Sequence, residues 1–209
     1  MSDTATTKEN LHPGMNLGYS GDAEHAEVTV FGFWTFLMSD LVTFGIVFAI
    51  FATMKDATAG GPGPAEVTNL TSIAIQTALL LGSSFAFSWA SLSMKYHDII
   101  WRTLGWLAIA ATSALGFLLL ELYDFYHMIQ EGAVPQRSGF LSALWALVGL
   151  HGLHVAGGLL WMAAMTGQIL KFGLTDQIKS RITRMGLYWH FLDVVWVGIF
   201  SMVYLAGVA

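Results

Sequence analysis

Four ionisable side chains lie inside two long apolar segments of this chain, His151 and His154 in one and His190 and Asp193 in the next. An ionisable group in the middle of a bilayer costs about 2.5–3.5 kcal/mol on insertion scales, so each should face protein, water or a partner. Neutral imidazole is also the commonest side-chain ligand of metals. The four residues are therefore candidates either for a metal or haem site or for a specific contact between helices.

The spacing places the four residues on two polar faces that can meet. At a rise of about 1.5 Å per residue, His154 is level with His190, and His151 with Asp193, when the two segments cross the bilayer in opposite directions. A bis-histidine haem needs a wide apolar slot, whereas bulky side chains here flank a glycine-rich contact. A zinc or copper site needs three or four converging ligands. We therefore interpret the four as a structural polar clamp, and we predict no catalytic residue, cofactor ligand or metal ligand.

Asp40 is a further acid inside an apolar segment, about ten residues from the start of that segment. It could relay protons, or it could form a hydrogen bond with Ser39, with Gln76 or with one of the histidines. A structural or gating role is the better interpretation, because one acid without a chain of partners conducts no protons.

Glu121 and Asp124 lie three residues apart, so they share one face of a helix near its outer end. A helix end near the membrane surface is hydrated, and the first expectation for this acidic face is a solvated end. A contact with Arg137 or with a neighbouring subunit is the sharper alternative.

The elements that position these residues are five apolar stretches, each long enough for a hydrocarbon core that needs about 20 helical residues. The stretches are continuously apolar and lack the alternation of barrel strands, so we expect helices. We predict an all-α, polytopic membrane bundle made of residues 29–209, preceded by a flexible tail at 1–28. The expected spans are about 30–54, 70–94, 103–129, 139–170 and 185–208.

Composition excludes several classes of protein. Charged residues make up only 11% of the chain and hydrophobic residues 55%, against about 25% charged residues in soluble domains. The chain has no cysteine, which excludes disulfides, thiolate metal sites and iron–sulfur clusters. The sequence shows no phosphate-binding glycine loop and no basic surface typical of nucleic-acid binding, so no nucleic-acid partner is expected.

Lysine and arginine are distributed unevenly between the two sides of the predicted bundle. Seven lie on the side of the N-terminus and the second and fourth loops, and only Lys55 and Arg137 lie on the other. The positive-inside rule then places the N-terminus in the cytoplasm and the C-terminus in the periplasm.

Five motifs of the chain together resemble a known family. They are FGFW at 31–34, LMSD at 37–40, RSGFLSA at 137–143, HGLHV at 151–155 and WHFLDVVW at 189–196. In combination they are similar to subunit III of the haem–copper oxidases, and the five-span length resembles the form found in ubiquinol oxidases of the cytochrome o (bo3) type.

The resemblance implies an accessory subunit, without redox centres of its own, in a complex that oxidises ubiquinol, reduces dioxygen to water and pumps protons across the bacterial inner membrane. Haems and copper would belong to subunit I, the main contact, and subunits II and IV would be further partners. The family's V-shaped cleft implies bound phospholipid. Asp40 would stand beside that cleft as a buried, protonated acid where the family has a carboxylate, and Asp124 where the longer form has Glu.

Three alternatives stay open at this point. The first is subunit III of a cytochrome c oxidase, because the electron donor is chosen on other subunits. The second is a stand-alone electron carrier with a haem b held by two histidines. The third is a proton channel or transporter that uses Asp40 and the histidines, although the five spans show none of the internal repeats common in transporters.

Overall fold

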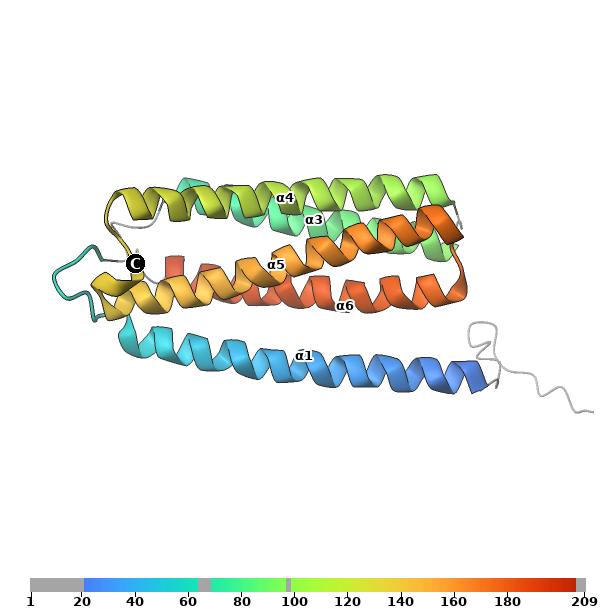
Figure 1. Cartoon of the computed structure of the whole chain (residues 1–209), viewed down its shortest axis with the longest axis horizontal. Helices are drawn as coiled ribbons and strands as arrows, with labels where there is room; N and C mark the ends of the chain where they lie inside the picture. The colour runs from blue at the N-terminus through green and yellow to red at the C-terminus, as the bar shows by residue number, and fades with distance from the viewer. Residues whose placement is uncertain (1–20, 64–68, 97–98, 206–209) are drawn as a thin grey trace, which may run out of the picture.

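The computed structural model describes residues 21–63, 69–96 and 99–205. Within this part of the chain the regular structure is entirely helical (Figure 1). The long helices are α1 (Gly21–Met54), α3 (Leu70–Tyr96), α4 (Ile100–Gln130), α5 (Gly139–Phe172) and α6 (Asp176–Ile199). A 3-10 turn, η1 (Pro135–Arg137), precedes α5, and a π-helical segment, η2 (Phe200–Leu205), continues α6.

Five helices are long and apolar enough to cross a membrane, which confirms the predicted all-α fold with five candidate spans. Each of the three helices α3, α5 and α6 begins at a polar side chain that satisfies free backbone N–H groups. Asn69 accepts hydrogen bonds from the N–H groups of Thr71 and Ser72, at 3.2 and 3.3 Å. Ser138 caps α5 and Thr175 caps α6 in the same manner.

Two helices begin earlier than the apolar pattern indicates. The expected fifth span starts near residue 185, whereas α6 starts at Asp176. Its first turns carry charged residues that lower the mean hydropathy, yet Ile178 and Ile182 are buried and fix the helix to the bundle. Helix α1 starts at Gly21, inside the expected tail. Residues 1–20 of that tail and 206–208 of the expected fifth span lie outside the described residues.

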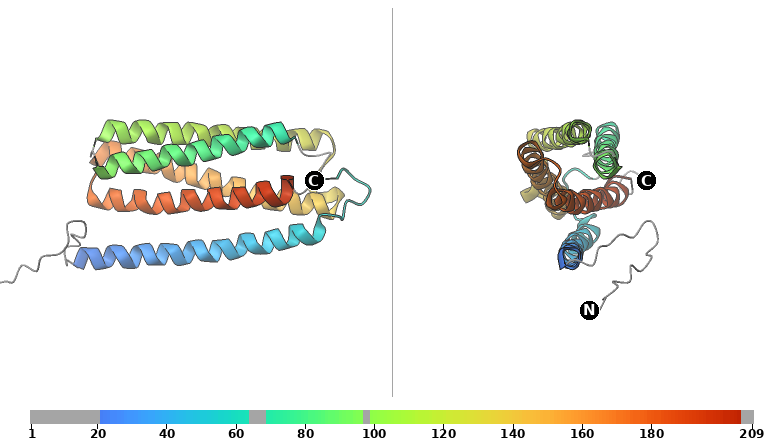
Figure 2. Two further views of the ribbon diagram at one scale, coloured as in Figure 1. Left: turned by 180° about the vertical axis from the view of Figure 1, so that it is seen from behind. Right: turned by 90° about the vertical axis from the view of Figure 1, so that its right-hand side faces the viewer.

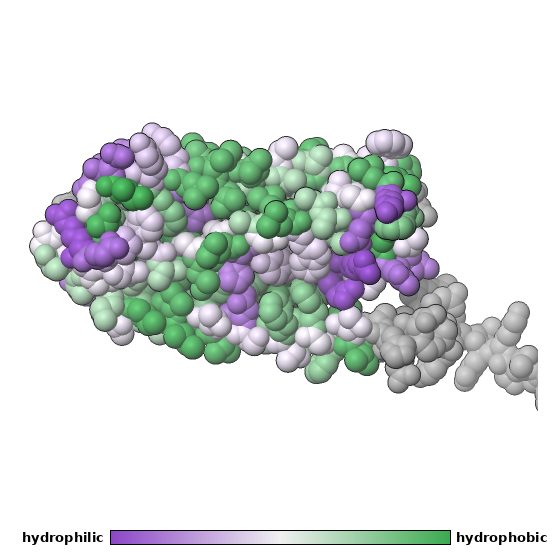
Figure 3. Space-filling model, viewed as in Figure 1, coloured by the Kyte–Doolittle hydropathy of each residue, from purple (hydrophilic) through white to green (hydrophobic). Residues whose placement is uncertain are grey.

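Helices α3, α4, α5 and α6 form a four-helix bundle, and α1 lies outside it against α5 and α6 (Figure 2). The stripe by which α1 packs has a spacing of seven residues: Leu37, Phe44 and Phe51 are all buried. The other faces of α1 carry exposed apolar side chains, among them Val42 and Ile46. On the face shown in Figure 3, apolar residues cover most of the middle, and polar residues gather towards the two ends.

Trp189 of α6 joins four helices at the centre of the bundle. Its Nε1 donates a hydrogen bond to Ser83 Oγ of α3 at 3.0 Å, and that hydroxyl in turn donates to the carbonyl oxygen of Ala110 of α4 at 2.8 Å. The indole ring lies against Gly158 of α5, where an added Cβ would be only 2.6 Å from ring atom Cζ3. The close packing of this buried indole therefore depends on a glycine.

We expect the substitution Gly158→Ala to destabilise the bundle by about 1–3 kcal/mol, because the added methyl group forces a buried indole or a helix to move. The measurement is the apparent unfolding temperature of the purified protein in detergent. Gly157→Ala is the matched control, since a Cβ there meets nothing within 4 Å. Equal unfolding temperatures for the two variants would show that the indole is not held as described.

Candidate functional site

Asp40 and His154 form a contact between α1 and α5. Oδ2 of Asp40 lies 3.3 Å from Nε2 of His154, although the geometry falls short of a well-formed hydrogen bond. The other ring nitrogen, Nδ1, lies 2.7 Å from the carbonyl oxygen of Leu150. A carbonyl oxygen only accepts hydrogen bonds, so Nδ1 carries the hydrogen.

His190 faces α3 and the outside of the bundle, away from His154. Its Nδ1 lies 2.7 Å from the hydroxyl oxygen of Ser84 and 3.7 Å from Oδ2 of Asp193. The Asp193 side chain is largely buried, whereas the His190 side chain is 51% exposed. His190 and Asp193 lie one turn apart on α6 and contact each other, as their spacing predicts.

His151 is completely buried, and neither ring nitrogen has a hydrogen-bond partner within the described residues. Aromatic rings surround it: the ring centroid of Trp196 is 5.2 Å away, that of Phe117 is 5.8 Å away and that of Phe44 is 6.5 Å away. Its ring is therefore packed as part of an aromatic cluster between α1, α4, α5 and α6.

The structure thus places the four residues of the expected clamp in three separate environments. His154 contacts α1, His190 contacts α3, and His151 lies among aromatic rings. The comparison of depths along two helices predicts the height of each side chain but not the direction in which it points. For this reason it could not predict that the four residues would lie in different environments. The hydrogen bond that joins α5 to α6 at this level comes instead from the hydroxyl of Tyr188, which donates to the carbonyl oxygen of His154 at 2.9 Å.

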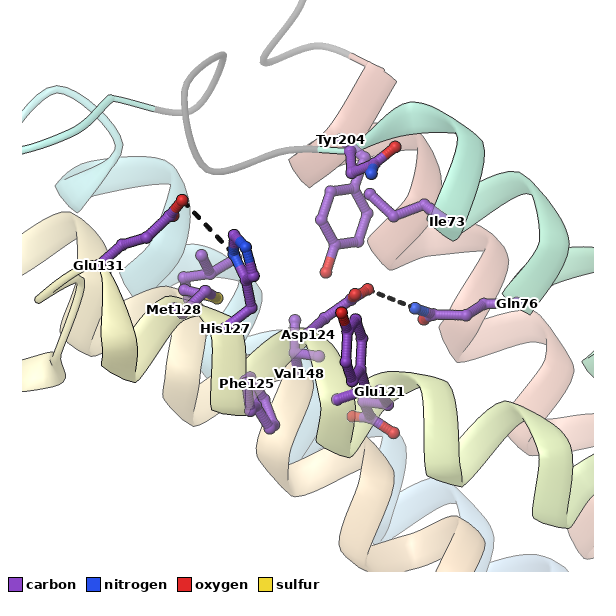
Figure 4. Close-up of a pocket in the computed structure, with 13 residues that line it drawn as sticks. Ile73, Gln76, Glu121, Asp124, Phe125, His127, Met128, Glu131, Val148 and Tyr204 are labelled. Atoms are coloured by element: carbon purple, nitrogen blue, oxygen red, sulfur yellow. Dashed lines mark hydrogen bonds and ion pairs between the residues drawn. The ribbon is translucent and has the colours of Figure 1, made fainter.

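The acidic face of α4 lines a cavity of about 250 Å³ towards the end of the bundle that carries η2 (Figure 4). Asp124 accepts hydrogen bonds from Ser72 Oγ at 2.9 Å and from Gln76 Nε2 at 2.6 Å, both on α3. The hydroxyl end of Tyr204 of η2 also points towards Asp124, from above in the view of Figure 4. Asp124 therefore links α4 to α3 within a polar cavity.

The expectation of a solvated helix end is wrong for Glu121, which is only 3% exposed. The helix continues to Gln130, so Glu121 lies well inside it. The carboxyl group packs against Gly152 of α5, where an added Cβ would be 2.7 Å from Oε1, and neither carboxyl oxygen has a hydrogen-bond partner within the described residues. Arg137 instead donates to the carbonyl oxygen of Gly132, at 3.3 Å.

Within the part of the chain that the structure describes, no three His, Asp or Glu side chains are grouped so that they could hold a metal ion. The arrangement supports helix-to-helix contacts rather than a nucleophile with a base. Sequence reasoning missed Ser84 and Tyr188 as partners. Gln76 was considered a partner of Asp40, whereas it binds Asp124; as the one amide side chain between residues 70 and 96, it could have been matched to an acid at its own depth.

Comparison with known proteins shows which family the sequence resembles. The sequence pattern of the family described as cytochrome c oxidase subunit III matches residues 16–208. The chain is 46% identical over 185 residues to the cytochrome bo(3) ubiquinol oxidase subunit 3 of Pseudomonas putida, covering 88% of this chain and 89% of that one. It is 41% identical to the protein of the same description in Pseudomonas aeruginosa, over 98% of both chains. It is also 42% identical to the cytochrome c oxidase subunit 3 of Bacillus sp. (strain PS3), over 84% of each.

We expect Asp40→Leu to destabilise the contact between α1 and α5 by about 0.5–1.5 kcal/mol, because it removes the carboxyl group that lies 3.3 Å from Nε2 of His154. Asp40→Asn should retain most of the stability, since the amide offers both a donor and an acceptor to the ring. The measurement is the apparent unfolding temperature in detergent. Ser39→Leu is the control at the same depth, because Ser39 is exposed. Equal losses for Asp40→Leu and Asp40→Asn would contradict the pairing.

Proposed function

The chain belongs to the cytochrome c oxidase subunit III family, and from that membership we propose that it is subunit III of a bacterial bo3-type ubiquinol oxidase. The observation that carries the proposal is the identity of 41–46% with two Pseudomonas proteins described as cytochrome bo(3) ubiquinol oxidase subunit 3, along nearly the whole chain. The complex would oxidise ubiquinol, reduce dioxygen to water and move protons across the inner membrane. This subunit would be multi-pass, with its N-terminus in the cytoplasm.

The proposed role is accessory. The haems and the copper would lie in subunit I, and this chain would stabilise that subunit, with subunits II and IV as further partners. The contacts of the histidines support this role, because His154 is paired with Asp40 and His190 with Ser84, on different sides of the bundle. A haem held by two histidines would need the two rings to face each other across one slot.

Bound phospholipid is the second part of the proposed role. Helix α1 buries one stripe and leaves its other faces apolar and exposed, which suits acyl chains. Asp40 would then lie at the inner edge of a lipid-covered surface, paired with His154.

One alternative has an observation of its own. The 42% identity with a cytochrome c oxidase subunit 3 over 84% of both chains shows that proteins with the other electron donor are about as similar. The donor is therefore the property of the proposal that most needs an experiment.

We expect the tagged chain, purified from its native membranes in mild detergent, to bring with it larger subunits that contain haem and copper. The purified complex should consume dioxygen with a ubiquinol analogue and not with reduced cytochrome c. Oxidation of cytochrome c alone would select the alternative donor. The chain purified by itself should show no Soret absorption, and a Soret band in proportion to the isolated chain would favour the haem b carrier instead.

A further inference from the structure

The carboxyl group of Glu121 is buried between α4 and α5 without a hydrogen bond. Neither of its oxygens is exposed, and neither has a hydrogen-bond partner among the described residues. A buried acceptor in this state has lost its bonds to water and gained none in exchange, which is unfavourable. The group therefore gains free energy in any other position where it can reach water or a donor.

The neighbour that occupies the space beside Gly152 can move. A Cβ at residue 152 would lie 2.7 Å from Oε1 and 2.8 Å from Oε2 of Glu121, the far end of a flexible side chain. At Gly158 the corresponding neighbour is the ring of Trp189, a rigid side chain held by a hydrogen bond to Ser83. Rotation about single bonds moves a carboxyl group from one staggered position to another without moving the helix.

A second place for the carboxyl group lies close by, in the cavity of about 250 Å³ that Glu121 itself helps to line. In Figure 4 the carboxyl group of Glu121 is turned away from Asp124, while the hydroxyl end of Tyr204 points towards Asp124. Asp124 is three residues further along α4, a spacing that places two Cβ atoms about 5–6 Å apart. The length of a glutamate side chain spans that distance, and a polar cavity of this size has room for water molecules.

We propose that the carboxyl group of Glu121 has two positions and that Gly152 makes the inner one possible. In the inner position, which the structure shows, the group lies between α4 and α5 and is shielded from water. In the outer position it lies in the cavity, where it accepts hydrogen bonds from water and can exchange a proton with it. The side chain is thus a switch that connects the α4–α5 interface with the polar end of the bundle, a moving part that an accessory subunit does not by itself require.

Ionisable side chains from three elements face the two positions. The inner position lies beside His151, which directly precedes Gly152 on α5. The cavity is lined by ionisable groups of α4 and η2, whereas α3 contributes neutral side chains such as Gln76. The ionisable residues of that lining, besides Glu121, are Tyr123, Asp124, His127, Glu131 and Tyr204.

The first test is Gly152→Ala in the full chain, purified from its native membranes. The added methyl group fills the inner position, so a density map that resolves side chains should show the carboxyl group of Glu121 in the cavity. Gly149→Ala, one turn earlier on α5, is the matched control, because a Cβ there meets only the ring of Phe125, at 4.0 Å. In that variant the carboxyl group should remain beside Gly152.

The unfolding temperature in detergent gives a second measurement of the same variant. Gly158→Ala should lower it by about 2–12 °C, whereas Gly152→Ala should lower it by less than about 2 °C, because a carboxyl group can turn aside and an indole cannot.

Infrared spectra test the switch in the unsubstituted chain. The difference between the spectra of the unsubstituted chain and of Glu121→Gln identifies the band of the Glu121 carboxyl group. Transfer from H₂O to D₂O should shift part of this band in the unsubstituted chain, and all of the corresponding band in Gly152→Ala, because only the outer position reaches water.

Three outcomes would overturn the inference. The first is a map of Gly152→Ala in which the carboxyl group still lies between the helices and α5 is displaced. The second is a loss of unfolding temperature as large as that of Gly158→Ala. The third is a Glu121 band that does not respond to D₂O in the unsubstituted chain, and this measurement decides the matter even if Gly152→Ala fails to fold.

Discussion

The absence of water from the bilayer core is the constraint on which this structure depends. A polar atom at that depth gains most from a partner inside the protein, because hydrocarbon offers none. Trp189, Ser83 and Ala110 show the result, where one hydroxyl accepts from α6 and donates to α4. The contact of Asp40 with His154 does the same between α1 and α5, and that of Asp124 with Gln76 between α4 and α3. These contacts fix which helices are neighbours, whereas apolar packing alone would allow many arrangements.

The same constraint explains how far the sequence could be interpreted. Five apolar stretches predicted five helices, because helix length must match the membrane, and a histidine was among the partners considered for Asp40. The direction of each side chain around its helix was beyond reach, since depth along the axis says nothing about rotation. His190 was expected to meet His154 and instead contacts Ser84 of α3. The start of α6 at Asp176 was missed because hydropathy does not register a capped, amphipathic first turn.

The interior also holds polar groups that the contacts leave unsatisfied. Both carboxyl oxygens of Glu121 and both ring nitrogens of His151 are buried without partners among the described residues. Glu121 of α4 packs against Gly152, which directly follows His151 on α5. A glycine there leaves the room that a carboxyl group needs between two closely packed helices. The α4–α5 interface is therefore polar at a depth where apolar packing would be the simpler solution.

Two kinds of side chain are exposed on the outer surface of the bundle, apolar ones and a polar one, and they differ in the neighbours that suit them. Exposed apolar side chains on α1, such as Val42 and Ile46, are as stable against acyl chains as against protein, so their exposure says little about partners. A half-exposed imidazole is different, because acyl chains cannot replace the hydrogen bond that it lost on leaving water. By this reasoning the exposed apolar faces of α1 suit acyl chains, whereas the half-exposed ring of His190 suits them poorly.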